Sequence, residues 1–119
     1  MNLSKKLIIA LVWTCSVSFI SLAPAKAAAT ELKITFTSNG FSPQVLEVPS
    51  ETLFKIVLVN ETDSAVEFES LRLRKEKVLA PGASSFIVIR GLSPGRYDFI
   101  DDFHPTLPPA TIFAKEATE

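Results

Sequence analysis

The chain has 119 residues, with 12 Lys plus Arg, 13 Asp plus Glu, one His, one Cys and one Trp. Residues 1–27 hold three of the basic residues and no acid, so the remaining 92 residues carry nine basic and 13 acidic side chains, a net charge near −4. This mildly acidic balance argues against a nucleic-acid partner and against direct lipid binding, and it leaves cation binding open.

Residues 1–27 have the pattern of a secretory signal peptide. A basic start is followed by an apolar centre, and small residues precede a predicted cut at Ala28. We therefore expect one mature domain, residues 28–119, in the periplasm. The only cysteine, Cys15, lies in the leader, which excludes a disulfide scaffold, a cysteine nucleophile and a thiolate metal site in the mature domain.

The mature chain reads as a series of short strands. Apolar and polar residues alternate from Glu31 to Thr37, a turn follows at 38–40, and Phe41 to Pro43 lead into a short strand from Val45 to Val48. The mostly apolar run from Leu53 to Val59 is typical of a central strand of a sandwich.

The second half continues this pattern. We expect strands at 66–70, 85–90, 97–101 and 111–115, while 71–80 is ambiguous and the proline-containing stretch 104–109 forms a loop. No helix is needed. Turn signals every eight to twelve residues predict an all-β fold, an antiparallel Greek-key β-sandwich of seven to eight strands.

Few residues in the mature domain could carry chemistry. It has no glycine-rich phosphate loop and no Ser, His and Asp set that favours acyl transfer. The candidates are carboxylates and one imidazole in two groups: Glu67, Glu69 and Glu76, and Asp101, Asp102 and His104.

The two groups differ in what they indicate. In a strand Glu67 and Glu69 share one face and Phe68 points to the other, a pattern also typical of a solvated surface. Asp101 ends an apolar strand, and His104 follows it in a rigid loop. Carboxylate and imidazole together are ligands for a hard or borderline divalent ion, although a lone His in a loop is more often structural.

These residues lie in a pattern that resembles the cupredoxin-like domain family over nearly the whole mature chain. The matching features are Phe41–Pro43, Val45–Pro49, Asn60 ahead of Glu67–Ser70, Glu76–Val78 with Pro81 and Gly82, and Leu92–Gly95 before Tyr97, Phe99 and Asp101–His104. Against the blue copper proteins of this fold, the resemblance places Glu67 near the first His ligand, Asp101 at the Cys and Pro109 near the axial Met. His104 keeps its histidine.

The departures from the blue copper pattern define what the site could hold. Blue copper needs a thiolate and a weak thioether, and this chain has a carboxylate and a proline there, so a blue copper electron carrier is excluded. By resemblance, Asp101 and His104 are primary metal ligands, Glu67 completes the set, and Glu69 and Glu76 assist or capture the ion. Asp102 orients His104 or faces solvent.

The pattern is most similar to the FtrB-type periplasmic component of bacterial ferrous iron uptake systems. That resemblance implies ferrous iron binding, oxidation to ferric iron, and delivery to an inner-membrane iron permease alongside a second periplasmic iron-binding protein, with copper as a candidate redox partner. Carboxylates stabilise ferric over ferrous iron, which favours oxidation but does not demonstrate a ferrous iron oxidase.

Two alternatives remain open. The same residues suit a cupric-copper chaperone or sensor, because divalent copper outcompetes most metals at nitrogen and oxygen sites. The domain could also be a metal-free interaction sandwich that docks to a partner by a sheet edge.

Overall fold

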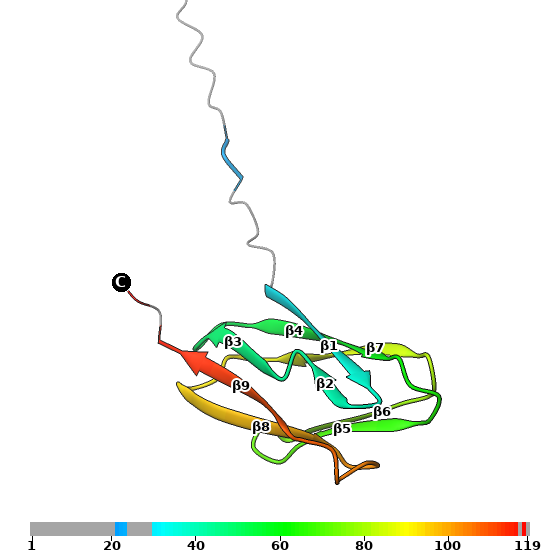
Figure 1. Ribbon diagram of the computed structural model, residues 1–119. Helices are drawn as coiled ribbons and strands as arrows, with labels where there is room; N and C mark the ends of the chain where they lie inside the picture. The colour runs from blue at the N-terminus through cyan, green and yellow to red at the C-terminus, as the bar shows by residue number, and fades with distance from the viewer. Residues whose placement is uncertain (1–20, 24–29, 117, 119) are drawn as a thin grey trace, which may run out of the picture.

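The computed structural model describes residues 21–23, 30–116 and 118 of the chain, so most of the predicted leader lies outside it. The described part is built from strands (Figure 1). These are β1 (Thr30–Thr37), β2 (Gly40–Ser42), β3 (Val45–Pro49), β4 (Phe54–Asn60), β5 (Val66–Ser70), β6 (Lys75–Leu79), β7 (Ser84–Ile89), β8 (Gly95–Asp101) and β9 (Ala110–Lys115). None of the described segments is a helix that could cross a membrane.

The strands form two packed sheets, which confirms the all-β sandwich. One sheet has the order β2-β1-β4-β7 and the other the order β3-β9-β8-β5-β6. The nine strands exceed the seven to eight expected, because Gly40–Ser42 pairs with β1 and because the ambiguous stretch resolves into a turn followed by β6.

The expectation of a purely antiparallel sandwich is wrong. β1 runs parallel to β4, with Ile34 opposite Leu58, and β3 runs parallel to β9, with Leu46 opposite Ile112. The cause is a change of sheet between β2 and β3: the chain crosses to the second sheet for β3 and returns to the first for β4, so β4 lies beside β1 and not beside the strand before it. Such pairing depends on contacts between distant segments, and local alternation does not report it.

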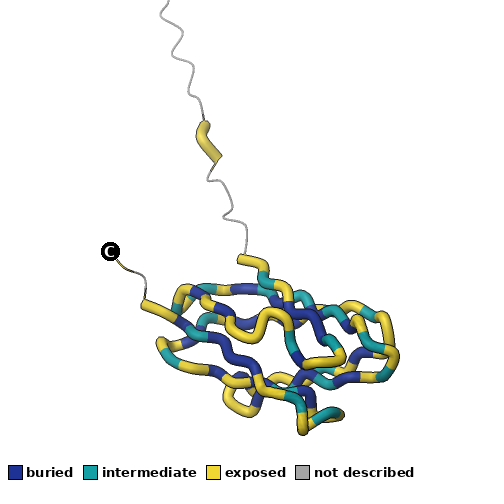
Figure 2. The backbone as a smooth tube through the Cα atoms, in the orientation of Figure 1, coloured by how far each residue is buried: buried dark blue, intermediate teal, exposed yellow. Residues whose placement is uncertain are grey.

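The core lies between the two sheets and follows the alternation within most strands, although β1 and β9 each bury three consecutive residues (Figure 2). In β4 the residues alternate between buried and partly exposed, with Phe54, Ile56 and Leu58 almost fully buried. An aromatic cluster crosses between the sheets: the Phe41 ring lies 4.9 Å from that of Phe36 and 4.7 Å from that of Phe99.

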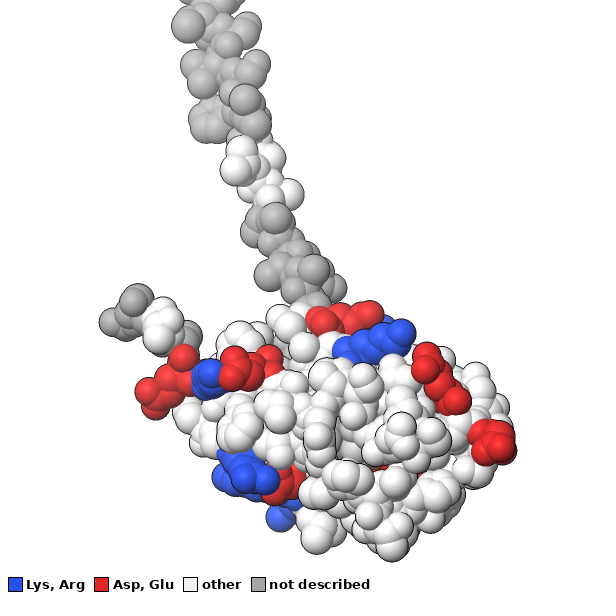
Figure 3. All heavy atoms as spheres, in the orientation of Figure 1, with Lys and Arg blue, Asp and Glu red and all other residues white. Residues whose placement is uncertain are grey.

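One end of this sandwich holds the candidate site. The β1–β2 turn, the loop after β4 and the loop after β8 meet there, and the Glu61 amide donates to the Phe36 carbonyl over 3.1 Å. The β1–β2 turn depends on Gly40, whose φ of 116° is a backbone conformation that other residues rarely adopt. On the face seen in Figure 3 both signs of charge lie around the rim and uncharged residues fill the middle.

Candidate functional site

Asp101 is a buried carboxylate at the C-terminal end of β8. It follows Tyr97 and Phe99 on the core face and is 5% exposed. Its Oδ1 accepts hydrogen bonds from the backbone amides of Glu67 (3.0 Å) and Phe103 (3.1 Å). These two donors compensate for the water that the carboxylate loses on burial and join β5 to the loop after β8.

His104 lies on the other oxygen of the same carboxylate. Its amide donates to the Asp101 carbonyl over 3.0 Å, and this turn brings the ring Nδ1 to 2.8 Å from Asp101 Oδ2. The His104 side chain is 38% exposed, whereas that of Asp101 is 4% exposed. A buried carboxylate thus orients a partly exposed imidazole, as carboxylates do behind metal-binding histidines.

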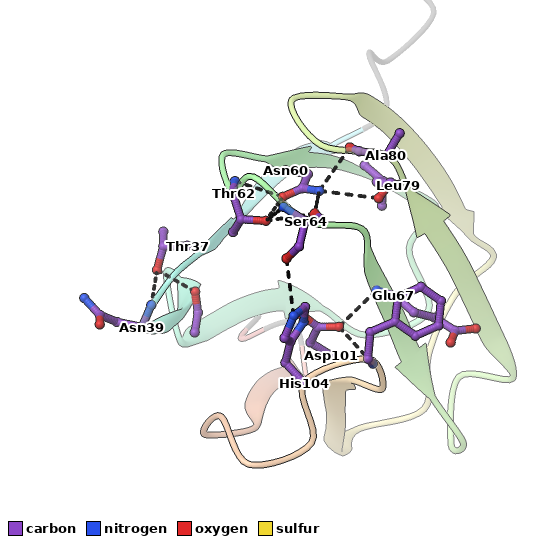
Figure 4. A network of polar contacts seen from close by, with 12 residues as sticks. Thr37, Asn39, Asn60, Thr62, Ser64, Glu67, Leu79, Ala80, Asp101 and His104 are labelled. Atoms are coloured by element: carbon purple, nitrogen blue, oxygen red, sulfur yellow. Dashed lines mark hydrogen bonds and ion pairs between the residues drawn. The ribbon is translucent and has the colours of Figure 1, made fainter.

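Ser64 completes this set of contacts from the loop after β4. Its Oγ lies 3.3 Å from His104 Nε2. The loop is fixed by Asn60, which is 1% exposed and whose Nδ2 donates to the Ser64 carbonyl over 2.8 Å. Asn60 Oδ1 accepts from the Thr62 amide and hydroxyl (Figure 4). Sequence reasoning missed Ser64, because a serine in a polar turn carries no local signal that distinguishes it from other turn residues.

A hollow of about 210 Å³ opens beside this group. We call it the His104 hollow; it is lined by Thr37, Ser38, Thr62, Asp63, Ser64, Asp101, His104 and Leu107. Its lining residues are polar in type apart from Leu107, and they include the exposed Asp63. A larger hollow, of about 400 Å³, lies over β8 beside Arg72 and Arg96, away from the imidazole.

The remaining predicted ligands lie on the outer face of the second sheet. Glu69 is opposite Glu76 of β6, and the Asp102 amide donates to the Glu67 carbonyl over 3.0 Å. Loss of water raises the pKa of Glu67, as do the charges of Asp102, Glu76 and Asp101 in decreasing order. The pKa of Glu69 is also raised, and loss of water is again the largest cause. The charge of Asp102, a hydrogen bond with Asp102 and the charges of Glu67 and Glu76 raise it further, in that order. These carboxylates repel one another, which favours a nearby cation.

The structure therefore brings together only part of the predicted ligand set. Asp101 and His104 are in contact, but the Glu67 carboxylate points away from them (Figure 4). Among the residues that the structure describes, no three His, Cys, Asp or Glu side chains are placed to hold one metal ion. The metal roles of Glu67, Glu69, Glu76, Asp101 and His104 stay predictions.

The donor set does not fit a blue copper ion. Residues 30–116 contain one His and neither Cys nor Met, and Asp101 accepts hydrogen bonds with both oxygens. One imidazole with oxygen donors nearby suits a divalent ion such as cupric copper, whereas cuprous copper prefers sulfur ligands. The nitrogen best placed to bind an ion is His104 Nε2, whose only described partner is the Ser64 hydroxyl.

Known proteins with a similar fold include several copper proteins. The metal-binding domain of the Cu(I)-exporting P-type ATPase CopA from Streptococcus pneumoniae D39 superposes with a TM-score of 0.67, covering 76% of this chain and 90% of that one at 13% identity. Auracyanin from Roseiflexus castenholzii gives 0.60, covering 74% and 98% at 14% identity. At these identities the similarity shows the fold alone.

Sequence comparison gives a nearer relative and the family. The chain is 39% identical over 74 residues to the uncharacterized protein RP394 of Rickettsia prowazekii (strain Madrid E), a match that covers 62% of this chain and 59% of the relative's length. The model of the cupredoxin-like domain matches residues 7–114. With a family match over most of its length and the two-sheet sandwich that goes with it, this chain belongs to the cupredoxin-like domain family.

Proposed function

We propose that this protein is exported to the periplasm and there binds a cupric ion through Nε2 of His104, as a chaperone or sensor. The observation that carries the proposal is the pair formed by Asp101 and His104. A buried carboxylate holds Nδ1 over 2.8 Å and leaves Nε2 directed toward the His104 hollow. Imidazoles held this way bind metals through the other ring nitrogen.

The choice of cupric copper rests on the donors around Nε2. Asp63, which carries a carboxylate, lines the same hollow, and nitrogen with oxygen is a ligand set that divalent copper accepts in a tetragonal arrangement. Proteins with a similar fold include the metal-binding domain of a Cu(I)-exporting ATPase and a Cu-containing nitrite reductase, which supports copper as the bound metal.

Ferrous or ferric iron is a second candidate, favoured by the acidic cluster on the outer face. Glu67, Glu69, Glu76 and Asp102 are hard oxygen donors, and the pKa values of Glu67 and Glu69 are raised first by loss of water and then by the charge of Asp102. In this case the protein would capture ferrous iron, assist its oxidation, and pass it to an inner-membrane iron permease together with a second periplasmic iron-binding protein.

Metal titration of residues 28–119 separates these candidates. Calorimetry and electron paramagnetic resonance with Cu²⁺ would be compared between wild type and His104→Gln, and anaerobic Fe²⁺ titration followed by oxygen would be compared between wild type and the Glu69→Gln/Glu76→Gln pair. Cupric binding with a nitrogen-coupled spectrum that His104→Gln abolishes supports the proposal.

Three other outcomes would each point elsewhere. Cupric binding that His104→Gln leaves unchanged removes His104 from the site. Iron binding that depends on Glu69 and Glu76, without tight copper binding, favours the iron transport function. Failure of wild type to bind either metal favours a metal-free interaction domain.

A further inference from the structure

The sequence indicated no Ser, His and Asp set that favours acyl transfer, but the fold brings Ser64, His104 and Asp101 together in the order nucleophile, base and orienting carboxylate. The Ser64 Oγ to His104 Nε2 distance is 3.3 Å, and the His104 Nδ1 to Asp101 Oδ2 distance is 2.8 Å. The three residues come from different segments, the loop after β4, the end of β8 and the loop after β8. A serine is activated when a base lies within hydrogen-bond reach of it and a third group holds that base. The distance between nucleophile and base is often longer before the substrate binds.

The direction of each hydrogen bond follows from the chemistry of the groups. Asp101 Oδ2 can only accept, so the contact with His104 requires the proton on Nδ1. A neutral imidazole with its proton on Nδ1 has a lone pair on Nε2, and the Ser64 hydroxyl is the donor to that lone pair. The amides of Glu67 and Phe103 hold Asp101 Oδ1, so the carboxylate is fixed in this orientation.

Ser64 is held in place by its backbone. Its carbonyl accepts from Asn60 Nδ2 (2.8 Å) and from the Thr62 hydroxyl (3.0 Å), while its side chain has the His104 contact. Asn60 is buried and also donates to the Ala80 carbonyl, which ties the loop to the end of β6. A nucleophile fixed in this way loses little further conformational freedom when it reacts.

The His104 hollow limits what could reach Ser64. Its volume of about 210 Å³ is below the roughly 300–1,000 Å³ of sites for drug-sized ligands, so it suits a short acyl group. The Asp63 carboxylate on its wall disfavours anionic acyl donors.

From this geometry we propose that Ser64 is an activated nucleophile that accepts short, uncharged or cationic acyl groups from activated esters. The Ser64 Oγ–H proton passes to His104 Nε2 as Oγ bonds to the acyl carbon, and the bond from that carbon to the leaving oxygen breaks. An alcohol leaving group takes the proton from His104 Nε2 as it departs; a phenolate departs without it, and His104 then gives the proton to water. Ser64 and His104 are the catalytic residues, and Asp101 is a positioning residue.

The test is acetylation of residues 28–119 by p-nitrophenyl acetate in EDTA, followed by peptide mass spectrometry for the rate of labelling at Ser64. We expect Ser64 to label much faster than the exposed Ser93 in the same sample, and His104→Gln to slow this labelling by about 10²-fold or more, the usual scale of general-base assistance. Ser64→Ala removes the labelled peptide, and Ser93→Ala is the matched control that leaves it unchanged. Equal rates at Ser64 and Ser93, or an unchanged rate in His104→Gln, would overturn the proposal.

Two further measurements make the result specific. Because His104 is the only histidine in the chain, its ring nitrogens can be followed by NMR, and Asp101→Asn should move the proton from Nδ1 to Nε2 while slowing Ser64 labelling. An Asp101→Asn variant that keeps the Nδ1 tautomer and labels at the wild-type rate would remove Asp101 from its positioning role. Since the labelling is run without metal, its outcome is independent of the copper titration: labelling without copper binding contradicts only the proposed function, and copper binding without labelling contradicts only this inference.

Discussion

Replacing Asp101 by alanine or by asparagine separates the contributions of its two oxygens. Alanine leaves the Glu67 and Phe103 amides without their acceptor and also frees His104. An orphaned buried donor costs about 1–3 kcal/mol, and partial access of water at this end places the total at about 2–4 kcal/mol. Asparagine keeps an oxygen for the two amides and changes only the contact with His104 Nδ1, where an accepting carboxylate becomes a donating amide, which costs about 1–2 kcal/mol.

The measurement is chemical denaturation of residues 28–119, followed by far-UV circular dichroism, for wild type and both variants. Asp63→Asn is the control, because this exposed carboxylate lies at the same end and such substitutions usually change stability by less than about 0.5 kcal/mol. Equal losses for alanine and asparagine would refute the reasoning that the two amide contacts, rather than the histidine contact, dominate the contribution of Asp101 to stability.

Three other substitutions test the electrostatics of the domain. Glu69→Gln removes a carboxyl whose pKa is raised in the folded state, chiefly by loss of water; because a raised folded pKa costs stability as the pH rises through it, the variant should melt higher than wild type at pH 7 and equally at pH 4. Thr111→Val removes the hydrogen bond from Thr111 Oγ1 to Asp98 (2.6 Å), the largest cause of the lowered pKa of Asp98. NMR titration should therefore show that pKa rising toward its ordinary value, and the stability lost by the variant at neutral pH should vanish as the pH falls through the folded pKa of Asp98; an unchanged Asp98 titration would contradict this. Ser64→Ala removes the competitor for His104 Nε2, so calorimetry should show cupric binding tightened by about five-fold, the equivalent of one hydrogen bond, and weakened binding would place Ser64 among the ligands.

Alternation within single strands predicted most of the fold. Phe68, predicted to lie on the face opposite Glu67 and Glu69, is buried at 0% exposed, and the proline-containing loop joins the last two strands as expected. The predicted antiparallel pairing was wrong for two pairs of strands. β1 with β4 and β3 with β9 are parallel because the chain changes sheet after β2. No residue near Pro43 indicates which distant strand will become a neighbour.

The same limit applies to the ligand set. The alternation along each strand indicates that Glu67 and Phe68 lie on opposite faces of the sheet and that Asp101 and Phe99 lie on the same face. The missing fact is the register, in which Phe68 lies opposite Asp101. Directly paired residues share a face, so this pairing places Asp101 inside and the Glu67 side chain outside. Bringing Glu67 to the Asp101 face would need a slip of one residue, which would expose Phe68 and bury two carboxylates. The fold therefore separates these ligands and leaves His104 Nε2, rather than a carboxylate trio, as the group that can bind a ligand at this end.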